Sequence, residues 1–167
     1  MLTKFKKKNI AFIIGHLSHG GAEKQLFLVN KMIDKSLFNP IVICLSKTPA
    51  PWGNRIEKIG VKVVYLRRFS RFDFFRLIEI IICLYKYKID LIVSYLHIAN
   101  VYSWLARIFY HRKNSYIAQI RSKEDNMSIV LRYLNIKAFN SANVIITNTS
   151  LLKIFAQKYF KQNTKKI

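Results

Sequence analysis

The chain has 167 residues, of which 51% are apolar and 14% aromatic, so it can build one domain with a core and is not a disordered tail. Lysine and arginine number 29 against 8 acidic residues, which gives a formal net charge of +21. Such an excess favours an anionic partner, namely a membrane surface, a nucleic acid or a phosphate-bearing small molecule. A compositional bias of the whole chain is the competing interpretation.

The amino-terminal segment 1–15 has a basic start followed by an apolar run, as a signal peptide does. The run is too short, and "HLSHGG" after it is not a small-residue cleavage site, so we predict a strand here. No stretch approaches the roughly 18 apolar residues of a transmembrane helix. We therefore expect a cytoplasmic protein, with or without peripheral attachment to the inner face of the plasma membrane.

Short apolar runs rich in β-branched residues alternate with segments of helical periodicity along the chain. Strands are predicted at 9–14, 40–45, 61–66, 90–95, 114–120 and 143–148, and all but the third are nearly continuous in apolar character. Helices are predicted at 22–35, 72–88, 98–110, 127–141 and 151–160, with a short one between the second and third strands. Pro49, Pro51 and Gly53 interrupt regular structure within 46–54.

The helical segments also predict core-facing stripes. In 72–88 the stripe holds Phe74, Leu77, Ile81 and Leu84, widened by Ile78 and Ile82. In 127–141 it holds Met127, Val130, Leu131, Leu134 and Ala138. Cys44 and Cys83 lie inside apolar runs and are predicted to be buried free thiols, and no cysteine spacing indicates a metal site.

Strands alternating with helices predict an α/β fold, a doubly wound, mostly parallel Rossmann-like sheet of six to seven strands with helices on both faces. Such a fold binds ligands at the carboxyl ends of its strands. The segments that we expect at this edge are 15–21, 46–53, 67–72, 95–98, 121–126 and 148–150.

The first strand runs into "IGHLSHGGAEKQL", residues 14–26, where Gly20 and Gly21 precede a helix. Glycines in such a turn allow the backbone to approach a ligand, and the helix directs its free N–H groups and positive dipole end at that point, which suits phosphate. The pattern is neither G-x-G-x-x-G nor a P-loop, and a tight turn without a ligand is the alternative.

This stretch resembles the first loop of the family 4-like (group 1) retaining glycosyltransferases, which are GT-B enzymes of two Rossmann-like domains. Four further segments are similar to that family in the same order: "WGNRIEKIGVKVVYL" (52–66), "KIDLIVSYLHIAN" (88–100), "AQIRS" (118–122) and "SANVIITNTSLLK" (141–153). Together they span nearly the whole chain. The resemblance identifies residues 1–167 as one GT-B amino-terminal domain.

The resemblance implies that this domain binds the acceptor and that its Gly20–Gly21 loop faces the cleft near the donor diphosphate. The carboxy-terminal domain, which holds most nucleotide-sugar contacts and a pair of acidic residues eight apart, has no counterpart in the 167 residues. We therefore expect no cofactor to be bound by this chain alone, a nucleotide-sugar donor for the complete enzyme, and a truncated or split form that is inactive by itself, because one half of a cleft cannot position donor and acceptor together.

Many relatives carry a histidine where this chain has Tyr95, while His97 lies two residues further on. His97 is interpreted as a cleft-facing helix start, a loop residue or a direct participant, and no catalytic residue is assigned. His16 and His19 flank the glycines, and either contact substrate or simply belong to a polar loop.

Four further candidate positions follow predicted strands or lie in the first turn of a helix. Arg121 suits bidentate pairing with a phosphate, or is a solvated loop cation. Asn148 and Ser150 follow the sixth strand, where Ser150 or Thr149 can cap the last helix instead of binding a ligand. Asn100 suits either a cleft contact or internal hydrogen bonding.

Cations mix with aromatics in four clusters, at 4–9, 66–76, 85–88 and 110–113. Such clusters suit an anionic bilayer, a nucleic acid or plain solvation, and no nucleic-acid fold motif accompanies them. The sequence thus predicts the acceptor domain of a glycosyltransferase in cell-surface polysaccharide or glycolipid assembly. The alternatives are a non-catalytic basic membrane-docking subunit that recruits a separate donor-binding chain, and a nucleotide- or nucleic-acid-binding domain.

Overall fold

A computed structural model of the chain describes residues 6–47, 50–67, 73–121 and 127–160. Parts of three predicted ligand-edge segments lie outside the described residues, namely 48–49 of 46–53, 68–72 of 67–72 and 122–126 of 121–126. The start of the first basic cluster also lies outside them. Strands and helices alternate along the chain. The elements are β1 (Lys8–Ile14), α1 (Gly21–Met32), β2 (Phe38–Cys44), α2 (Pro51–Lys58), β3 (Lys62–Tyr65), α3 (Phe74–Lys86), β4 (Leu91–Tyr95), α4 (His97–Phe109), β5 (Ser115–Ile120), α5 (Ile129–Ser141), β6 (Val144–Thr147) and α6 (Ser150–Phe160).

The described strands form one six-stranded sheet in the order β3-β2-β1-β4-β5-β6, with every pairing parallel. The predicted α/β, doubly wound architecture is therefore confirmed, and the sheet is wholly parallel. The chain moves outward from β1 to β3, crosses back to β4 beside β1, and moves outward again to β6. That change of direction creates the crevice in which such folds bind ligands, between the carboxyl ends of β1 and β4.

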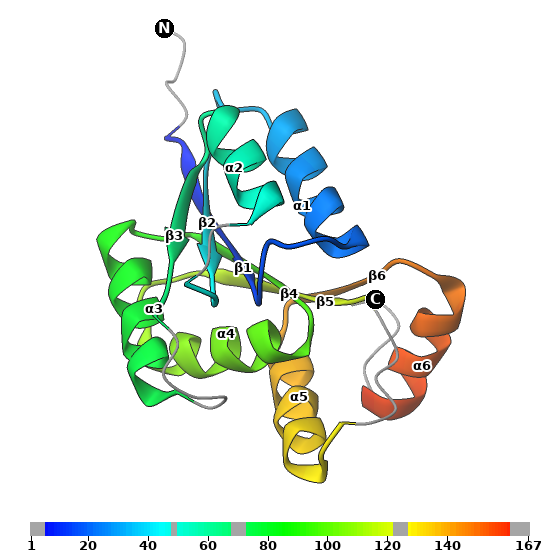
Figure 1. The fold of residues 1–167 in the computed structure, drawn as a ribbon. Helices are drawn as coiled ribbons and strands as arrows, with labels where there is room; N and C mark the ends of the chain where they lie inside the picture. The colour runs from blue at the N-terminus through cyan, green and yellow to red at the C-terminus, as the bar shows by residue number, and fades with distance from the viewer. Residues whose placement is uncertain (1–5, 48–49, 68–72, 122–126, 161–167) are drawn as a thin grey trace, which may run out of the picture.

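Two cores lie on opposite faces of the sheet (Figure 1). Side chains alternate along β1, so Ile10, Phe12 and Ile14 pack toward α1 and α2, while Ala11 and Ile13 pack toward α3, α4, α5 and α6. Most strands are therefore covered on both faces, which explains their continuous apolar sequences. Cys44 and Cys83 are buried with free thiols, as predicted.

The nearly continuous apolar run at 143–148 predicted a strand covered on both faces, but β6 is covered on one face only. Val144 and Ile146 on this edge strand are about two-fifths exposed. Among the described residues, only Ile145 of β6 joins a buried core, on the face toward α5 and α6. On the opposite face of the sheet, the core under α1 and α2 includes no residue of β6. No described helix packs on that face of β6.

Two of the predicted helical stripes were too wide. On α3, Leu77 and Leu84 are buried with Ile80, but Phe74, Ile78 and Ile82 are exposed. On α5, Leu131 and Ala138 are buried while Val130 is exposed. The reason is geometric, since each helix buries only the side that faces the sheet and α4.

The break predicted within 46–54 was partly wrong, because Pro51 and Gly53 belong to α2. Pro51 occupies the first turn, where the missing N–H of a proline breaks no helical hydrogen bond. Gly53 lies against the hydroxyl of Tyr65, so that an added Cβ has no room.

Candidate functional site

The carboxyl edge of the sheet gathers the polar side chains that the sequence singled out. Gly20 is the N-cap of α1 and Gly21 its first residue, and both are exposed. His16 and His19 are exposed in the loop before them. Across the crevice, Tyr95 ends β4, Gln119 lies opposite it in the parallel register with β5, and Arg121 follows β5.

Arg121 is fixed over the end of the sheet by two neighbours. Its guanidinium lies 5.3 Å from the centroid of the Tyr95 ring, and its Nε donates to Oε1 of Gln119 at 2.8 Å. Tyr95 is buried, and its ring also lies 6.4 Å from that of Phe12 in β1. Arg121, Gln119 and Tyr95 thus form one stacked group, called here the Arg121 cluster.

Burial tunes the charges of this cluster. It raises the pKa of the Tyr95 hydroxyl, although Gln119 and the positive charge of Arg121 act in the opposite direction. Burial likewise lowers the pKa of Arg121, a side chain that stays protonated in proteins. The described partners of the guanidinium are neutral, so the cluster holds a half-buried positive charge at the crevice.

A buried carboxylate lies at the first turn. Glu23 is only 2% exposed, its Oε1 lies 2.8 Å from Nδ1 of His16, and its carboxylate folds back against Gly20. Ser18 Oγ also lies 2.9 Å from the same His16 nitrogen. Glu23 therefore brings a negative charge of this chain to the amino end of α1, where the helix dipole favours an anion.

Asn100 is fully buried and serves the interior of the site. Its Oδ1 accepts from Ser94 Oγ at 2.5 Å and its Nδ2 donates to the Gln119 carbonyl at 3.1 Å. Tyr116 joins the same network through its hydroxyl, which lies 3.0 Å from Ser94 Oγ and donates to the Asn100 carbonyl at 3.1 Å. These bonds tie β4, β5 and the first turn of α4 together beneath the Arg121 cluster.

The turn between β4 and α4 is strained. Leu96 has φ 70° and ψ 163°, a region used almost only by glycine, and such a conformation costs on the order of 1–3 kcal/mol. It places His97 as the first residue of α4, where the side chain is buried at 7% exposure. His97 is therefore part of the wall beneath the crevice and not an exposed loop residue.

The last strand end contributes exposed groups. Asn148 and Ser150 are both exposed, and Ser150 is the first residue of α6. Thr149 Oγ1 accepts from the Leu152 amide at 3.2 Å, so Thr149 caps this helix. From the sequence, either Thr149 or Ser150 was a candidate N-cap of this helix.

Two members of the site were missed from sequence. Gln119 was passed over inside an apolar strand, although it lies two residues before Arg121 and therefore on the same face of β5. Glu23 was not selected as a site residue. Its burial could have been predicted because Glu23 lies three residues after the N-cap, and an acidic side chain at that position can fold back over the cap.

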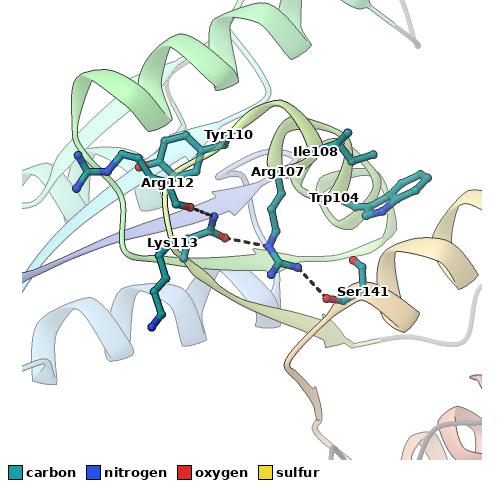
Figure 2. A pocket seen from close by; sticks show the side chains of 8 residues that line it. Trp104, Arg107, Ile108, Tyr110, Arg112, Lys113 and Ser141 are labelled. Atoms are coloured by element: carbon teal, nitrogen blue, oxygen red, sulfur yellow. Dashed lines mark hydrogen bonds between the residues drawn. The ribbon is translucent and has the colours of Figure 1, made fainter.

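A hollow of about 360 Å³ lies at the opposite, amino edge of the sheet (Figure 2). Arg107 at its centre donates from Nε to Asn114 Oδ1 at 2.9 Å and from a terminal nitrogen to the Ser141 carbonyl at 2.8 Å. Figure 2 shows Arg112 and Lys113 pointing away from Arg107. The hollow thus lies between α4, the 110–114 loop and the end of α5, and its central cation Arg107 is already bonded to neutral groups of this chain.

Comparison with known proteins gives matches in structure only. No protein-family model matches the chain, and no curated protein matches it. Among solved structures, HepE (Alr3699) of Anabaena in complex with UDP matches 95% of this chain with a TM-score of 0.75 at 14% identity. A glycosyltransferase from Rickettsia africae matches 98% with a TM-score of 0.71 at 16% identity, and the lipopolysaccharide outer core galactosyltransferase WaaB matches 95% with a TM-score of 0.66 at 15% identity.

This chain has the fold of one domain of a GT-B glycosyltransferase. It spans 42% of the HepE and Rickettsia chains and 44% of WaaB. The resemblance noted in the sequence is thus confirmed at the level of fold. The Arg121 cluster and the Gly20–Gly21 loop both lie at the carboxyl edge of the sheet of this domain.

Proposed function

We propose that this chain is the acceptor-side domain of a retaining glycosyltransferase, which transfers a sugar from a nucleotide-sugar donor to a lipid-linked or saccharide acceptor during assembly of a cell-surface polysaccharide or glycolipid. The observation that carries the proposal is the Arg121 cluster, a fixed cation at the crevice of a GT-B half-domain. HepE has been solved with UDP and with UDP-glucose, and WaaB is a lipopolysaccharide galactosyltransferase, which supports this class of substrates.

In this proposal Arg121 binds a phosphate. Gln119 and Tyr95 hold its guanidinium before substrate arrives, so little side-chain entropy is lost on binding. A phosphate of a lipid-diphosphate acceptor, or the diphosphate released from the donor, gains a charge-assisted hydrogen bond in partly desolvated surroundings. The Asn100 network supports the cluster from below.

The first turn has a different proposed role. Because the Glu23 carboxylate already lies at the amino end of α1, a second anion there is disfavoured unless His16 is charged. With Nδ1 of His16 engaged by Glu23 and Ser18, Nε2 is the ring nitrogen that is left to meet a neutral group. We therefore assign this loop to acceptor hydroxyls and the phosphate to Arg121.

Binding to the purified chain tests the proposal. Isothermal titration compares UDP-glucose with a short-chain polyprenyl-diphosphate sugar as the acceptor probe, in detergent-free buffer. We expect the acceptor probe to bind, and Arg121→Gln to weaken it about tenfold or more. The matched control is Arg132→Gln on the exposed surface of α5, which leaves affinity unchanged. Binding that is indifferent to Arg121→Gln, or absence of any binding by the acceptor probe, overturns the proposal.

A further inference from the structure

The outer face of α3 carries a row of apolar side chains exposed to solvent. Phe74, Phe75 and Ile82 are exposed by 71%, 66% and 57%. Ile78 and Tyr85 continue the row at helical spacing, and Phe109 at the end of α4 adjoins it, because Tyr85 donates its hydroxyl to the Phe109 carbonyl at 3.0 Å. These six residues are called here the α3 surface.

The exposure of these side chains does not come from loose packing of α3 against the core. The opposite side of the same helix is buried through Leu77, Ile80 and Leu84. Arg76 also faces inward, 3% exposed, with its guanidinium 5.4 Å from the centroid of the Tyr102 ring. The helix therefore has two apolar sides, one packed in the core and one exposed to solvent. A contiguous apolar face of this kind marks an interaction site.

Basic side chains surround the α3 surface. Arg67 lies at its amino end, where it lines a hollow of about 450 Å³ with Phe75, Ile78 and Glu79. At its carboxyl end, Lys62 and Lys86 lie on the Tyr87 ring, 5.2 Å and 5.7 Å from its centroid. The His111 amide donates to the Tyr85 hydroxyl at 3.1 Å, which brings the exposed Arg112 to the same end. Glu79 is the acidic side chain on this helix, and it accepts from the Arg67 amide.

We propose that the α3 surface docks the protein on an anionic lipid bilayer. Phenylalanine and isoleucine enter the interface between headgroups and acyl chains, while the surrounding lysine and arginine meet lipid phosphates. The exposed apolar row runs along the whole 13-residue helix, about 20 Å, so in this proposal α3 lies in the plane of the membrane. No helix among the described residues is long and apolar enough to cross a bilayer.

The net charge of the chain favours an anionic bilayer over a second copy of the chain as the partner of the α3 surface. A second copy of the chain brings the same basic surroundings and the same formal charge of +21, so pairing through this surface opposes like charges. An anionic bilayer meets both features at once, apolar side chains at the centre and cations around them. The proposal does not rest on the proposed function, since it uses neither the Arg121 cluster nor the first turn.

Vesicle flotation with the 167-residue chain tests the proposal. We expect the chain to float with vesicles of phosphatidylcholine and phosphatidylglycerol, to stay behind with phosphatidylcholine alone, and to be released by high salt. The double variant Phe74→Gln/Ile82→Gln lowers the bound fraction at least about tenfold. The matched control Val29→Gln/Met32→Gln removes two exposed apolar side chains from α1, on the other face of the sheet, and floats normally.

A second pair of variants separates charge from apolar contact. Lys86→Ala/Arg112→Ala reduces binding on the order of tenfold at low salt, whereas Lys24→Ala/Lys31→Ala on α1 reduces it less. In addition, Phe74→Trp reports insertion directly, through a blue shift of its emission with anionic vesicles and quenching by brominated lipids. A shift confined to anionic vesicles supports the proposal.

Three results overturn it. They are absence of flotation at low salt, equal loss of flotation in the α1 and α3 variants, and a Phe74→Trp emission unchanged by vesicles. Sedimentation that shows a dimer dispersed by Phe74→Gln/Ile82→Gln, with flotation unaltered, assigns the surface to self-association instead. Binding to oligonucleotides without binding to vesicles assigns the basic surroundings to nucleic acid.

Discussion

At the carboxyl edge of the sheet Ser94, Asn100 and Gln119 are buried, whereas on the outer face of α3 Phe74 and Phe75 are exposed. Each region departs from the usual distribution of side chains, in opposite directions. Buried polar groups are tolerated because they bond to one another, and they hold the Arg121 cluster in place. Exposed apolar groups face water in the folded chain as they do in the unfolded chain, so they add little to stability, and their surface is available for binding. The comparison predicts that substitutions in the first region change stability, and those in the second change binding.

The largest expected effect comes from Asn100→Ala. It removes the buried hydrogen bonds that the Asn100 side chain makes with Ser94 and with the Gln119 carbonyl, so the free energy of unfolding falls by about 3 kcal/mol. Urea unfolding followed by circular dichroism measures this. Asn148→Ala, at an exposed position on the same edge, is the control and changes stability by less than about 0.5 kcal/mol. Equal effects of the two variants refute the structural role of the network.

The next effect concerns pH at the carboxyl end of β2. Burial raises the pKa of the Cys44 thiol from 9.0 to about 11. Below pH 9 the thiol is protonated in both states, and between pH 9 and 11 the unfolded chain loses the proton while the native chain keeps it. The free energy of unfolding therefore falls over this window, by on the order of 2 kcal/mol.

Urea unfolding of the wild type and of Cys44→Val across the same pH range isolates this effect. The variant lacks the thiol and shows a shallower alkaline decline. If both proteins lose stability in parallel, other groups carry the decline, among them Tyr65, whose pKa burial raises to about 12.

A smaller effect is expected at the first turn. An added Cβ at Gly20 collides with the buried Glu23 carboxylate, whereas one at Gly21 meets nothing within 4 Å. Gly20→Ala therefore forces Glu23 away from His16 and costs about 1 kcal/mol, while Gly21→Ala is neutral or slightly stabilising inside the helix. Thermal unfolding compares the two, and a larger loss for Gly21→Ala contradicts the geometry.

The smallest effect lies on the α3 surface. Phe74→Ala and Ile82→Ala remove side chains that touch little of the folded chain, so stability changes by less than about 0.5 kcal/mol. A loss above about 2 kcal/mol, seen by urea unfolding, shows that these residues belong to the core and removes the contrast between the two regions.

Much of the fold could be predicted from the sequence, because parallel strands that are covered on both faces have continuous apolar sequences. The runs at 9–14 and 40–45 became β1 and β2 with boundaries shifted by at most two residues. The exposed side of α3 was not accessible. Phe74 and Ile82 fit a helical stripe as well as Leu77 does, and only the position of the neighbouring α4 decides which side is buried.

The site was accessible in part. Tyr95 was selected because many members of the resembled family carry a histidine at that strand end, and Arg121 because it follows a strand at the ligand-binding edge. Their mutual stacking depends on the β4–β5 register. The position of Glu23 three residues after the N-cap is a local signal that its side chain folds back, but its contact with His16 depends on the path of the loop between them. Asn100 left two interpretations open, and the burial that separates internal bonding from exposure to the cleft is a tertiary property.

The placement of β1 at the centre of the sheet bears on how the chain is made. β1 pairs on one side with β2 and on the other with β4, where Ile10 meets Leu91 and the Asn9 amide donates to Asp90 across 81 residues. While a ribosome synthesises the chain, β1, β2 and β3 can assemble first, and β1 then presents an unpaired apolar edge until 91–95 emerge. An unpaired edge of this kind invites pairing with other nascent chains. The return crossing through α3 thus sets both the crevice of the finished domain and the interval in which its synthesis is most exposed to aggregation.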